Sequence, residues 1–307
     1  MSTRAFIFPG QGSQFVGMGR DVYERFPEAR AVYDQATEAV AFDLKGLCFQ
    51  GPEDTLSLTT YTQPAILTTS LALWACLGNP DAAFFAGHSL GEFTAMAAGG
   101  ALDWADAARL VMARGRSMQE AVPSGEGAMA AVIGLENQAV EEVCTRAWET
   151  GRVWPANYNC PGQVVITGER PGVEMAMALA REKGARHALL LPVSIPSHCP
   201  LMESAASLLA NEVDAIALRD SRVPILSNSR AAPVHKRDDL RGVMIEQMTS
   251  PVRWDDGIRL MIREGVTTFI EVGPGRVLTG LVRRIDKGVE VIPISDVPSL
   301  ELYKETL

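Results

Sequence analysis

The sequence predicts a mixed α/β fold with a smaller unit inserted into it. Strand-like apolar runs alternate with helical patterns over residues 4–100 and again over 267–285. Such alternation is typical of parallel strands covered by helices. Residues 126–192 instead follow the order β-α-β-β-α-β, which is typical of a ferredoxin-like unit. We therefore expect a core formed by residues 1–125 and 193–307 and a subdomain over 126–192.

Composition and charge narrow the class of protein. The chain has 307 residues, of which 47% are hydrophobic and 21% charged, as in ordinary soluble globular proteins. Its net charge of −9 argues against a nucleic-acid-binding surface. The most apolar long stretch, Ala65–Leu77, is too short to span a bilayer and predicts a buried helix.

The cysteines and the N-terminal residues indicate a cytoplasmic protein. The cysteine count is odd, and the spacing forms neither a C-x-x-C pair nor a zinc-like pattern, so we expect reduced thiols and no metal site. The N-terminal apolar run stops at Pro9-Gly10, which is too early for a signal-peptide core. The five cysteines are Cys48, Cys76, Cys144, Cys160 and Cys199.

The first two predicted strands each lead into a glycine-rich turn. Arg4–Phe8 runs into Pro9–Ser13, and Ala82–Ala86 runs into Gly87-His88-Ser89-Leu90-Gly91. The second turn fits G-x-S-x-G and is followed by a helical pattern over Glu92–Ala98. Strand, sharp turn and helix are the context in which such a serine is a nucleophile, although an ordinary βα turn also fits.

Acyl-transfer chemistry at Ser89 would need two donors for the oxyanion. In this kind of turn one donor is the backbone N–H of the residue after the nucleophile, here Leu90. We expect the first strand to lie beside the second, which would bring the backbone N–H of Gln11 to the same place. A tight turn that serves only the backbone is the alternative for Gln11.

Arg114 is the most informative single residue. A helix predicted over Asp103–Ala121 places Arg114 on its apolar stripe, whereas Arg109 and Arg116 fall on the opposite face. A buried cation requires an anionic partner, which is either a protein carboxylate or the carboxylate of a ligand, and the pattern leaves both open. The stripe consists of Ala107, Leu110, Val111 and Met118.

The remaining elements follow in order. The inserted unit is predicted to contain strands at Ala128–Ile133, Val153–Asn157, Val164–Thr167 and His187–Leu191, with helices at Glu136–Thr150 and Pro171–Lys183. After it, Thr267–Val272 reads as a strand that leads through Gly273-Pro274-Gly275 into a helix.

His198 is the best candidate for the base that a nucleophilic serine needs. It lies in the proline-bracketed loop Ile195–Pro200, at the end of the inserted unit. His88 would point away from its neighbour Ser89, His187 opens a predicted strand, and His235 lies in a polar run. A histidine that is only hydrogen-bonded structure remains the alternative reading of His198.

These motifs together resemble malonyl-CoA:acyl carrier protein transacylases of bacterial type II fatty acid synthesis, a family related to polyketide synthase acyltransferase domains. The resemblance covers almost the whole chain. Its segments are Phe8–Gln14, Thr62–Ala65, Gly87–Glu92, Arg114–Gln119, Asn159–Val165, Pro196–His198 and Glu271–Gly275.

The resemblance implies a fold and a role for each matching residue. It implies an α/β-hydrolase-like core with a ferredoxin-like insertion. Ser89 is then the nucleophile, His198 the base and Arg114 the clamp on the free malonyl carboxylate, while Gln11 and Leu90 form the oxyanion hole. In place of a triad aspartate, the main-chain carbonyl of Gln247, ahead of Ser250-Pro251-Val252, orients the histidine. Preference among acyl groups would depend on the pocket around Gln63 and Ser197.

The same resemblance implies malonyl-CoA and acyl carrier protein as partners, no cofactor beyond the CoA substrate, and a monomer. Carrier proteins of this kind are acidic, so a chain of net charge −9 would need a clustered basic surface. Arg276, Arg283, Arg284 and Lys287 are one candidate docking patch, and Lys183 and Arg186 are another. A solvated helix face is the alternative for each of these residues.

Three other functions remain open from the sequence. A serine esterase or thioesterase would use the same Ser89 and His198, but it would not explain the core-facing Arg114. A non-catalytic scaffold that binds carrier protein would not need these residues at all. A trans-acting polyketide synthase acyltransferase would keep the chemistry and change only the carrier.

Overall fold

The computed structural model describes residues 3–123, 125–193 and 195–306, so Ser124 and Ser194, which lie near the two predicted boundaries between the core and the inserted unit, are outside it. Its strands are β1 (Arg4–Phe8), β2 (Phe84–Gly87), β3 (Gly127–Ile133), β4 (Val153–Cys160), β5 (Gln163–Glu169), β6 (His187–Leu190), β7 (Ile225–Leu226), β8 (Pro233–Val234), β9 (Thr268–Val272) and β10 (Glu290–Ile294). Its α-helices are α1 (Arg20–Arg25), α2 (Pro27–Val40), α3 (Leu44–Gln50), α4 (Glu53–Leu56), α5 (Thr59–Leu77), α6 (Leu90–Ala98), α7 (Trp104–Glu120), α8 (Asn137–Ala147), α9 (Arg170–Glu182), α10 (Glu203–Asp214), α11 (Arg237–Thr249), α12 (Trp254–Arg263), α13 (Val277–Ile285) and α14 (Val297–Lys304).

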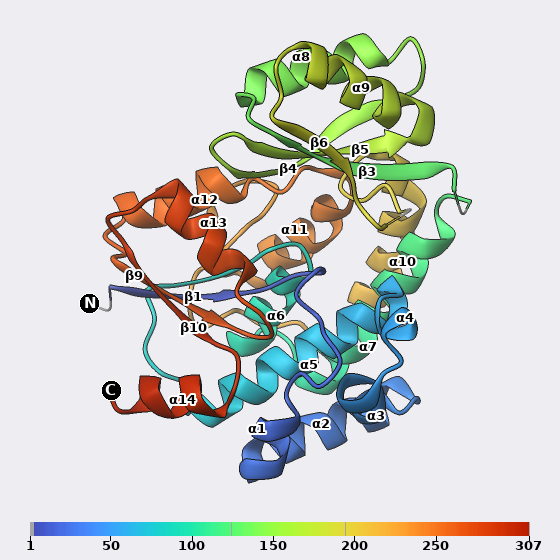
Figure 1. Cartoon of the computed structure of the whole chain (residues 1–307). Coiled ribbons are helices and arrows are strands. Elements are labelled where there is room, and N and C mark those ends of the chain that lie inside the picture. The colour runs from blue at the N-terminus through green and yellow to red at the C-terminus, as the bar shows by residue number, and fades with distance from the viewer. Residues whose placement is uncertain (1–2, 124, 194, 307) are drawn as a thin grey trace.

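The larger sheet has six strands in the order β10-β9-β1-β2-β7-β8. All neighbours pair in parallel except β7 and β8, which are antiparallel. Helices cover both of its faces (Figure 1). Strand β1 shows why this is required: Phe6 and Phe8 are buried in one hydrophobic core, whereas Ala5 and Ile7 are buried in another on the opposite face. The predicted mixed α/β class is confirmed.

Aromatic packing fixes the larger core beneath β1 and β2. Trp74 of α5 meets Phe6 and Phe85 edge-on, with ring centroids 5.0 and 5.2 Å apart. Such pairs each add about 0.5–1.5 kcal/mol beyond the area they bury. Helix α5 is almost entirely buried and begins at Thr59, earlier than the predicted apolar stretch, and it contains Pro64 near its N-terminal end.

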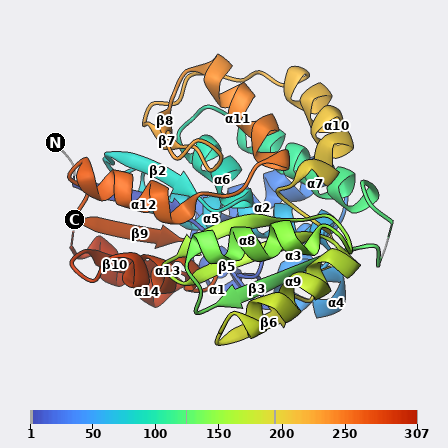
Figure 2. The ribbon, with the colours of Figure 1, turned by 90° about the horizontal axis from the view of Figure 1, so that it is seen from above.

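The smaller sheet is antiparallel, with the strand order β4-β5-β3-β6. Helices α8 and α9 cover its outer face, and the whole unit lies above the larger sheet (Figure 1; Figure 2 shows it from above). Its strands and helices occur in the predicted order. The inner face carries Met129, Ala156 and Val165, against which Leu191 and Val193 pack. This apolar face is the part of the unit that borders the site described below.

The structure bears on two expectations from the sequence, one about the cysteines and one about membrane-spanning helices. The five cysteines are buried and free. Among the described residues there is no helix long and apolar enough to cross a membrane, the 19-residue α5 included.

Candidate active site

A tight turn at the carboxyl end of β2 carries Ser89. Its φ of 52° and ψ of −107° lie in a strained region for a residue with a side chain, and α6 begins at the next residue. The neighbouring β1 loop approaches closely: a Cβ on Gly91 would lie 2.0 Å from the Phe8 carbonyl oxygen, and one on Gly10 would lie 2.3 Å from that of His88. Only glycine fits at Gly91 and Gly10.

Ser89 and His198 form a hydrogen-bonded pair. The Ser89 Oγ lies 2.8 Å from His198 Nε2, and His198 Nδ1 lies 2.9 Å from the main-chain oxygen of Gln247. Gln247 belongs to the last turn of α11, where carbonyl groups lack partners within the helix. A helix C-terminus, with its partial negative charge, therefore takes the position that a carboxylate has in other serine–histidine pairs.

The imidazole of His198 is buried and neutral. Burial, reinforced by the nearby charge of Arg114, lowers its pKa from 6.5 to about 3. Its backbone φ of 62° is left-handed, which is uncommon for a residue with a side chain and typical of functional sites. A neutral imidazole whose Nδ1 donates to a carbonyl presents Nε2 as a proton acceptor toward Ser89.

Arg114 is buried, as its helical stripe predicts, and it faces Ser89. Its Nη1 donates to Gln63 Oε1 at 2.8 Å, and its Nη2 donates to Gln247 Oε1 at 2.7 Å and to Ser89 Oγ at 3.2 Å. Its Nε has no hydrogen-bond partner among the described residues. Arg109 and Arg116 are exposed on the opposite face of α7.

The surroundings of Arg114 show whether a protein carboxylate, one of the two anionic partners that the sequence left open, is paired with it. Within the described residues, no carboxylate forms an ion pair with Arg114; two glutamine oxygens accept from it instead. Burial lowers its pKa to about 10, so it stays charged at neutral pH, and its guanidinium lies 5.2 Å from the Phe93 ring centroid. The cation is thus held in place but not neutralised by direct contact with a carboxylate.

Close approach of two helices places Arg114 beside Gln63. A Cβ on Gly115 would lie 2.7 Å from the Thr59 carbonyl oxygen, so α7 and α5 touch backbone to backbone at this point. This contact brings the side chains of Arg114 and Gln63 from the two helices within hydrogen-bond reach.

Sequence reasoning missed Asn228 and Glu92. Asn228, in the turn after β7, accepts from the Ser89 N–H at 2.7 Å and donates to the Gly87 oxygen at 2.7 Å, which holds the Ser89 turn in place. Glu92 is fully buried and accepts from the Asn228 N–H at 3.1 Å and from the Gln247 side-chain amide. The signal for Glu92 was the same as for Arg114, a charge among apolar residues, whereas nothing local singles out Asn228.

The two backbone donors expected for an oxyanion are available. No hydrogen bond is formed by the backbone N–H of Gln11 or Leu90 to another described residue, whereas the next N–H groups of the turn, those of Gly91 and Glu92, donate to carbonyls. Leu90 is also the first residue of α6, where the helix dipole favours negative charge. The Gln11 side chain donates to Thr59 Oγ1 at 3.2 Å.

A cavity of about 400 Å³ connects these groups and opens between the two sheets. Gln11, Gln63, Ser89, Leu90, Arg114, Ser197 and His198 all line it, so the predicted site residues meet there, with Gln247 directly behind. The small sheet supplies the opposite wall through Met129, Asn157, Asn159, Gln163 and Val165, and α13 supplies Val277, Leu278 and Leu281.

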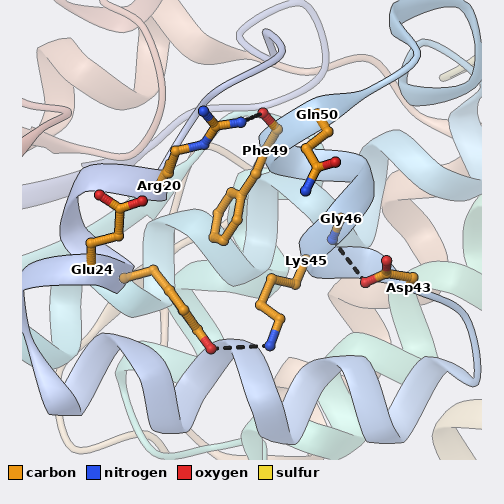
Figure 3. A pocket seen from close by; sticks show the side chains of 8 residues that line it. Arg20, Glu24, Asp43, Lys45, Gly46, Phe49 and Gln50 are labelled. Atoms are coloured by element: carbon orange, nitrogen blue, oxygen red, sulfur yellow. Dashed lines mark hydrogen bonds between the residues drawn. The ribbon is translucent and has the colours of Figure 1, made fainter.

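A second cavity, of about 580 Å³, shares no lining residue with the first. Its polar groups connect α1 to α3 (Figure 3). Lys45 donates to the Tyr23 hydroxyl at 3.0 Å, Arg20 donates to the Phe49 carbonyl, and Asp43 accepts from the Gly46 N–H at the start of α3. It contains no nucleophile paired with a base.

Among the described residues, none of the other three histidines forms a side-chain hydrogen bond to Ser89. The His88 ring lines the same cavity, but its Nε2 is hydrogen-bonded to Asn159 Oδ1 at 2.8 Å. His187 begins the outer strand β6, and the His235 main-chain oxygen accepts from the Ser221 N–H.

No group of three metal-binding side chains occurs within residues 3–123, 125–193 and 195–306.

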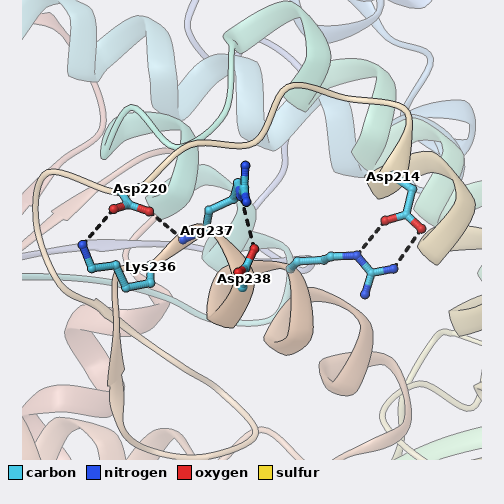
Figure 4. A network of polar contacts seen from close by, with 6 residues as sticks. Asp214, Asp220, Lys236, Arg237 and Asp238 are labelled. Carbon is cyan, nitrogen blue, oxygen red and sulfur yellow. Dashed lines mark hydrogen bonds and ion pairs between the residues drawn. The ribbon is translucent and has the colours of Figure 1, made fainter.

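Helix α11 is anchored at the end opposite Gln247. Arg241 binds Asp214 through two nitrogens at 2.6 and 2.8 Å, and Asp220 binds both the Lys236 side chain and the Arg237 N–H at 2.9 Å (Figure 4). These contacts are exposed to solvent and each contributes little energy. Together they attach the start of α11 to the end of α10 and to the segment that follows it.

Comparison with known proteins agrees with this geometry. The model of the acyl transferase domain family matches residues 5–302. A malonyl CoA-acyl carrier protein transacylase of Bacillus subtilis is 47% identical, over 100% of this chain and 98% of its own. An acyl carrier protein S-malonyltransferase structure from Vibrio cholerae is 43% identical, with a TM-score of 0.96 over 98% of this chain and 100% of its own.

A third relative was solved with its partner. It is described as a type II PKS acyl-carrier protein in complex with its malonyl-transacylase, and it is 39% identical with a TM-score of 0.97 over the full length of both chains. A family match across nearly the whole chain, together with full-length relatives of this identity, leaves no other assignment. This protein belongs to the acyl transferase domain family.

Proposed function

We propose that this protein transfers a malonyl group from malonyl-CoA to the phosphopantetheine thiol of acyl carrier protein. One observation carries the choice of acyl group: the Arg114 guanidinium lies 3.2 Å from Ser89 Oγ in the same cavity. An acyl group esterified to Ser89 and ending in a carboxylate can therefore meet this cation only if its chain is short. The names of the relatives support the same substrate and carrier.

In the first half-reaction, Ser89 Oγ attacks the thioester carbon while its proton moves to His198 Nε2. The resulting imidazolium is stabilised by the Gln247 carbonyl at the C-terminal end of α11. As the carbon–sulfur bond breaks, the proton passes from His198 to the CoA thiolate, which leaves as the thiol. The product is a malonyl ester of Ser89.

The oxyanion that forms in each step would rest on the backbone N–H groups of Leu90 and Gln11, which have no other acceptor among the described residues. Arg114 would hold the malonyl carboxylate, with its free Nε–H among the available donors. Gln63 and Ser197, which also line the cavity, would border the acyl group and limit its size.

In the second half-reaction the carrier thiol gives its proton to His198 and its sulfur attacks the ester carbon. The ester carbon–oxygen bond breaks, and Ser89 recovers the proton. Transfer is thus ping-pong, through a covalent enzyme. The apolar side chains of Met129 and Val165, on β3 and β5, support this step because they would limit the access of water to the ester.

We propose that carrier protein docks at the exposed basic residues on α13 and at its two ends. Arg276, Arg283, Arg284 and Lys287 are exposed there, and the exposed Val277 of the same helix lines the cavity. Lys183, in the other candidate patch, is already paired with Glu142. Charge reversal of both Arg283 and Arg284 should slow transfer to carrier protein and leave Ser89 acylation unchanged; unchanged transfer would remove this patch.

The architecture and context expected from the resemblance are part of the same proposal. The strand order β4-β5-β3-β6 with α8 and α9 on one face supports a ferredoxin-like subdomain over 126–192, and the six-stranded sheet supports a hydrolase-like core over 1–125 and 193–307. Reduced thiols support the cytoplasm. We propose a monomer with no cofactor beyond its CoA substrate.

Intact-mass spectrometry tests the proposed function. Separate incubations with malonyl-CoA, acetyl-CoA and methylmalonyl-CoA should give a malonyl adduct that forms faster than the other two adducts, and no adduct should form on Ser89→Ala. The adduct should move to holo acyl carrier protein when this is added. Rapid release of free malonate without carrier protein would favour a thioesterase, and the absence of any adduct would exclude acyl transfer. The rates with fatty acid and polyketide carrier proteins then distinguish the pathway.

A further inference from the structure

Asn228 and Gln247 bind the Ser89 backbone, and among the described residues Glu92 is the only carboxylate hydrogen-bonded to either of them. The mechanism above does not use Glu92. It is fully buried in the first turn of α6. One carboxylate oxygen accepts from the Asn228 N–H and the other from the Gln247 side-chain Nε2. Burial raises the pKa of Glu92 to about 8, while these hydrogen bonds and the charge of Arg114 oppose that rise.

Gln247 connects Glu92 to the reacting groups. Its Nε2 donates to Glu92 and, at 2.9 Å, to the Ser89 carbonyl, while its Oε1 accepts from Arg114 at 2.7 Å. Its main-chain oxygen accepts from His198. One side chain thus touches the nucleophile and the clamp, and its backbone touches the base.

A glutamine amide can occupy its site in two orientations of nearly equal shape, so its contacts must select one. In the observed orientation every contact joins a donor to an acceptor. A flip of the Gln247 amide would turn NH₂ toward the Arg114 guanidinium and oxygen toward the Glu92 carboxylate. Glu92 contributes to this choice because its Oε1 accepts from the Asn228 N–H, which fixes the side chain, and its Oε2 then faces the Gln247 amide as an acceptor that matches NH₂.

We propose that Glu92 is a positioning residue that fixes the orientation of the Gln247 amide and, through it, the Arg114 guanidinium. The inference rests on the proposed function, since it concerns the grip on an acyl carboxylate. It predicts selectivity: loss of Glu92 should impair transfer of a diacid group more than transfer of acetyl, which has no carboxylate for the guanidinium to hold.

Glu92→Gln is the sharpest test because it keeps the shape and replaces one acceptor by an NH₂ donor. The rates of Ser89 acylation with malonyl-CoA and with acetyl-CoA should be measured in parallel by intact mass. We expect the malonyl rate to fall about tenfold and the acetyl rate to fall less than about threefold. Equal losses, or no loss, would overturn the proposal.

Glu271→Gln is the matched control. Glu271 is also a fully buried glutamate whose oxygens accept N–H bonds, from Leu278 and Thr279, but it holds the start of α13 and does not touch Gln247. A loss of stability alone should lower both acylation rates together in this variant. A fall in the malonyl-to-acetyl ratio equal to that of Glu92→Gln would also overturn the proposal.

Gln247→Met completes a double-mutant cycle and keeps the main-chain carbonyl that His198 needs. If Glu92 acts through Gln247, the double variant should have the same malonyl-to-acetyl ratio as Gln247→Met alone. Additive effects would overturn the proposal. If Glu92→Gln does not fold, Gln247→Met decides alone, and an unchanged ratio overturns it. Wild-type protein that fails to form any malonyl adduct would instead count against the proposed function.

Discussion

The two sides of the cavity contribute different kinds of groups to the site. The turn after β2, helix α7 and the loop before α10 supply the groups that we expect to react or to bind the acyl carboxylate, namely Ser89, Arg114 and His198. The antiparallel sheet supplies the opposite wall, through side chains such as Met129 and Val165. Strand ends and helix ends converge at the carboxyl edge of a parallel sheet, whereas the face of the antiparallel sheet presents a row of side chains that is part apolar and part polar here.

The largest difference between the two regions should appear when their histidines are replaced. His198→Ala should slow Ser89 acylation about 10²–10⁴-fold, because the proton acceptor is lost. His187→Ala, on the exposed strand β6 of the small sheet, should leave the rate unchanged. Intact-mass kinetics with malonyl-CoA measure both. A His198→Ala enzyme that acylates at the wild-type rate would break the comparison.

Replacing a glycine by alanine should also cost more stability at the Ser89 turn than in the small sheet. Gly91→Ala places a Cβ 2.0 Å from the Phe8 oxygen and should destabilise the protein by about 3 kcal/mol. Gly162→Ala, in the β4–β5 turn, meets nothing nearer than 3.9 Å and bears only the cost of a left-handed φ, about 1 kcal/mol. Urea unfolding measures the stability of both variants. Equal losses of unfolding free energy would show that the turn at Ser89 is not the tighter of the two sites.

Arg114→Ala tests whether the reacting half also selects the acyl group. We expect malonyl acylation to fall about 100-fold and acetyl acylation to fall only a few-fold, because only the diacid leaves a buried carboxylate unpaired. Arg109→Ala, on the exposed face of the same helix, is the control and should change neither rate. Equal losses of malonyl and acetyl transfer would contradict the clamp.

The buried imidazole should make stability depend on pH. The folded pKa of His198 is lowered to about 3, so its contribution is present above its unfolded pKa of about 6.5 and is lost as the pH falls below that value. Relative to His198→Gln, the wild type should lose up to about 1.4 kcal/mol of unfolding free energy per pH unit between those values. Unfolding curves at several pH values measure this, and parallel profiles would contradict it.

The smallest expected effect is that of a substitution on the inner face of the small sheet, which lines the cavity. Val165→Ala removes apolar surface from the inner face of the small sheet and should raise KM for malonyl-CoA about fivefold, equivalent to about 1 kcal/mol, with kcat unchanged. Steady-state kinetics separate the two constants. A large loss of kcat would show that the small sheet takes part in the chemistry.

The same two regions explain what could be predicted from sequence. The small unit is built from neighbouring segments with clear periodicity, and its strands and helices follow the expected order. In the large sheet β1, β2 and β9 were predicted, but β7, β8 and β10 were not. The first two of these are only two residues long, so they carry no periodic signal, and they are defined by pairing with distant segments.

The site shows the same limit. Ser89, His198 and Arg114 stand out locally, as a motif, as a scarce residue type and as a charge on an apolar stripe. Asn228 has no such signal, because its importance comes from a contact with a turn 139 positions away. The resemblance supplied Gln247, whose role depends on where α11 ends relative to His198 and so cannot be derived from spacing alone.

The attachment of the small unit has a consequence for how such enzymes can diversify. Its first and last strands, β3 and β6, pair with each other, so the chain leaves the large unit and returns to it at adjacent points. A segment with neighbouring ends can be exchanged for another without rerouting the rest of the chain. Exchange of this unit would reshape the passage for the incoming thiol arm and leave the ester-forming machinery intact.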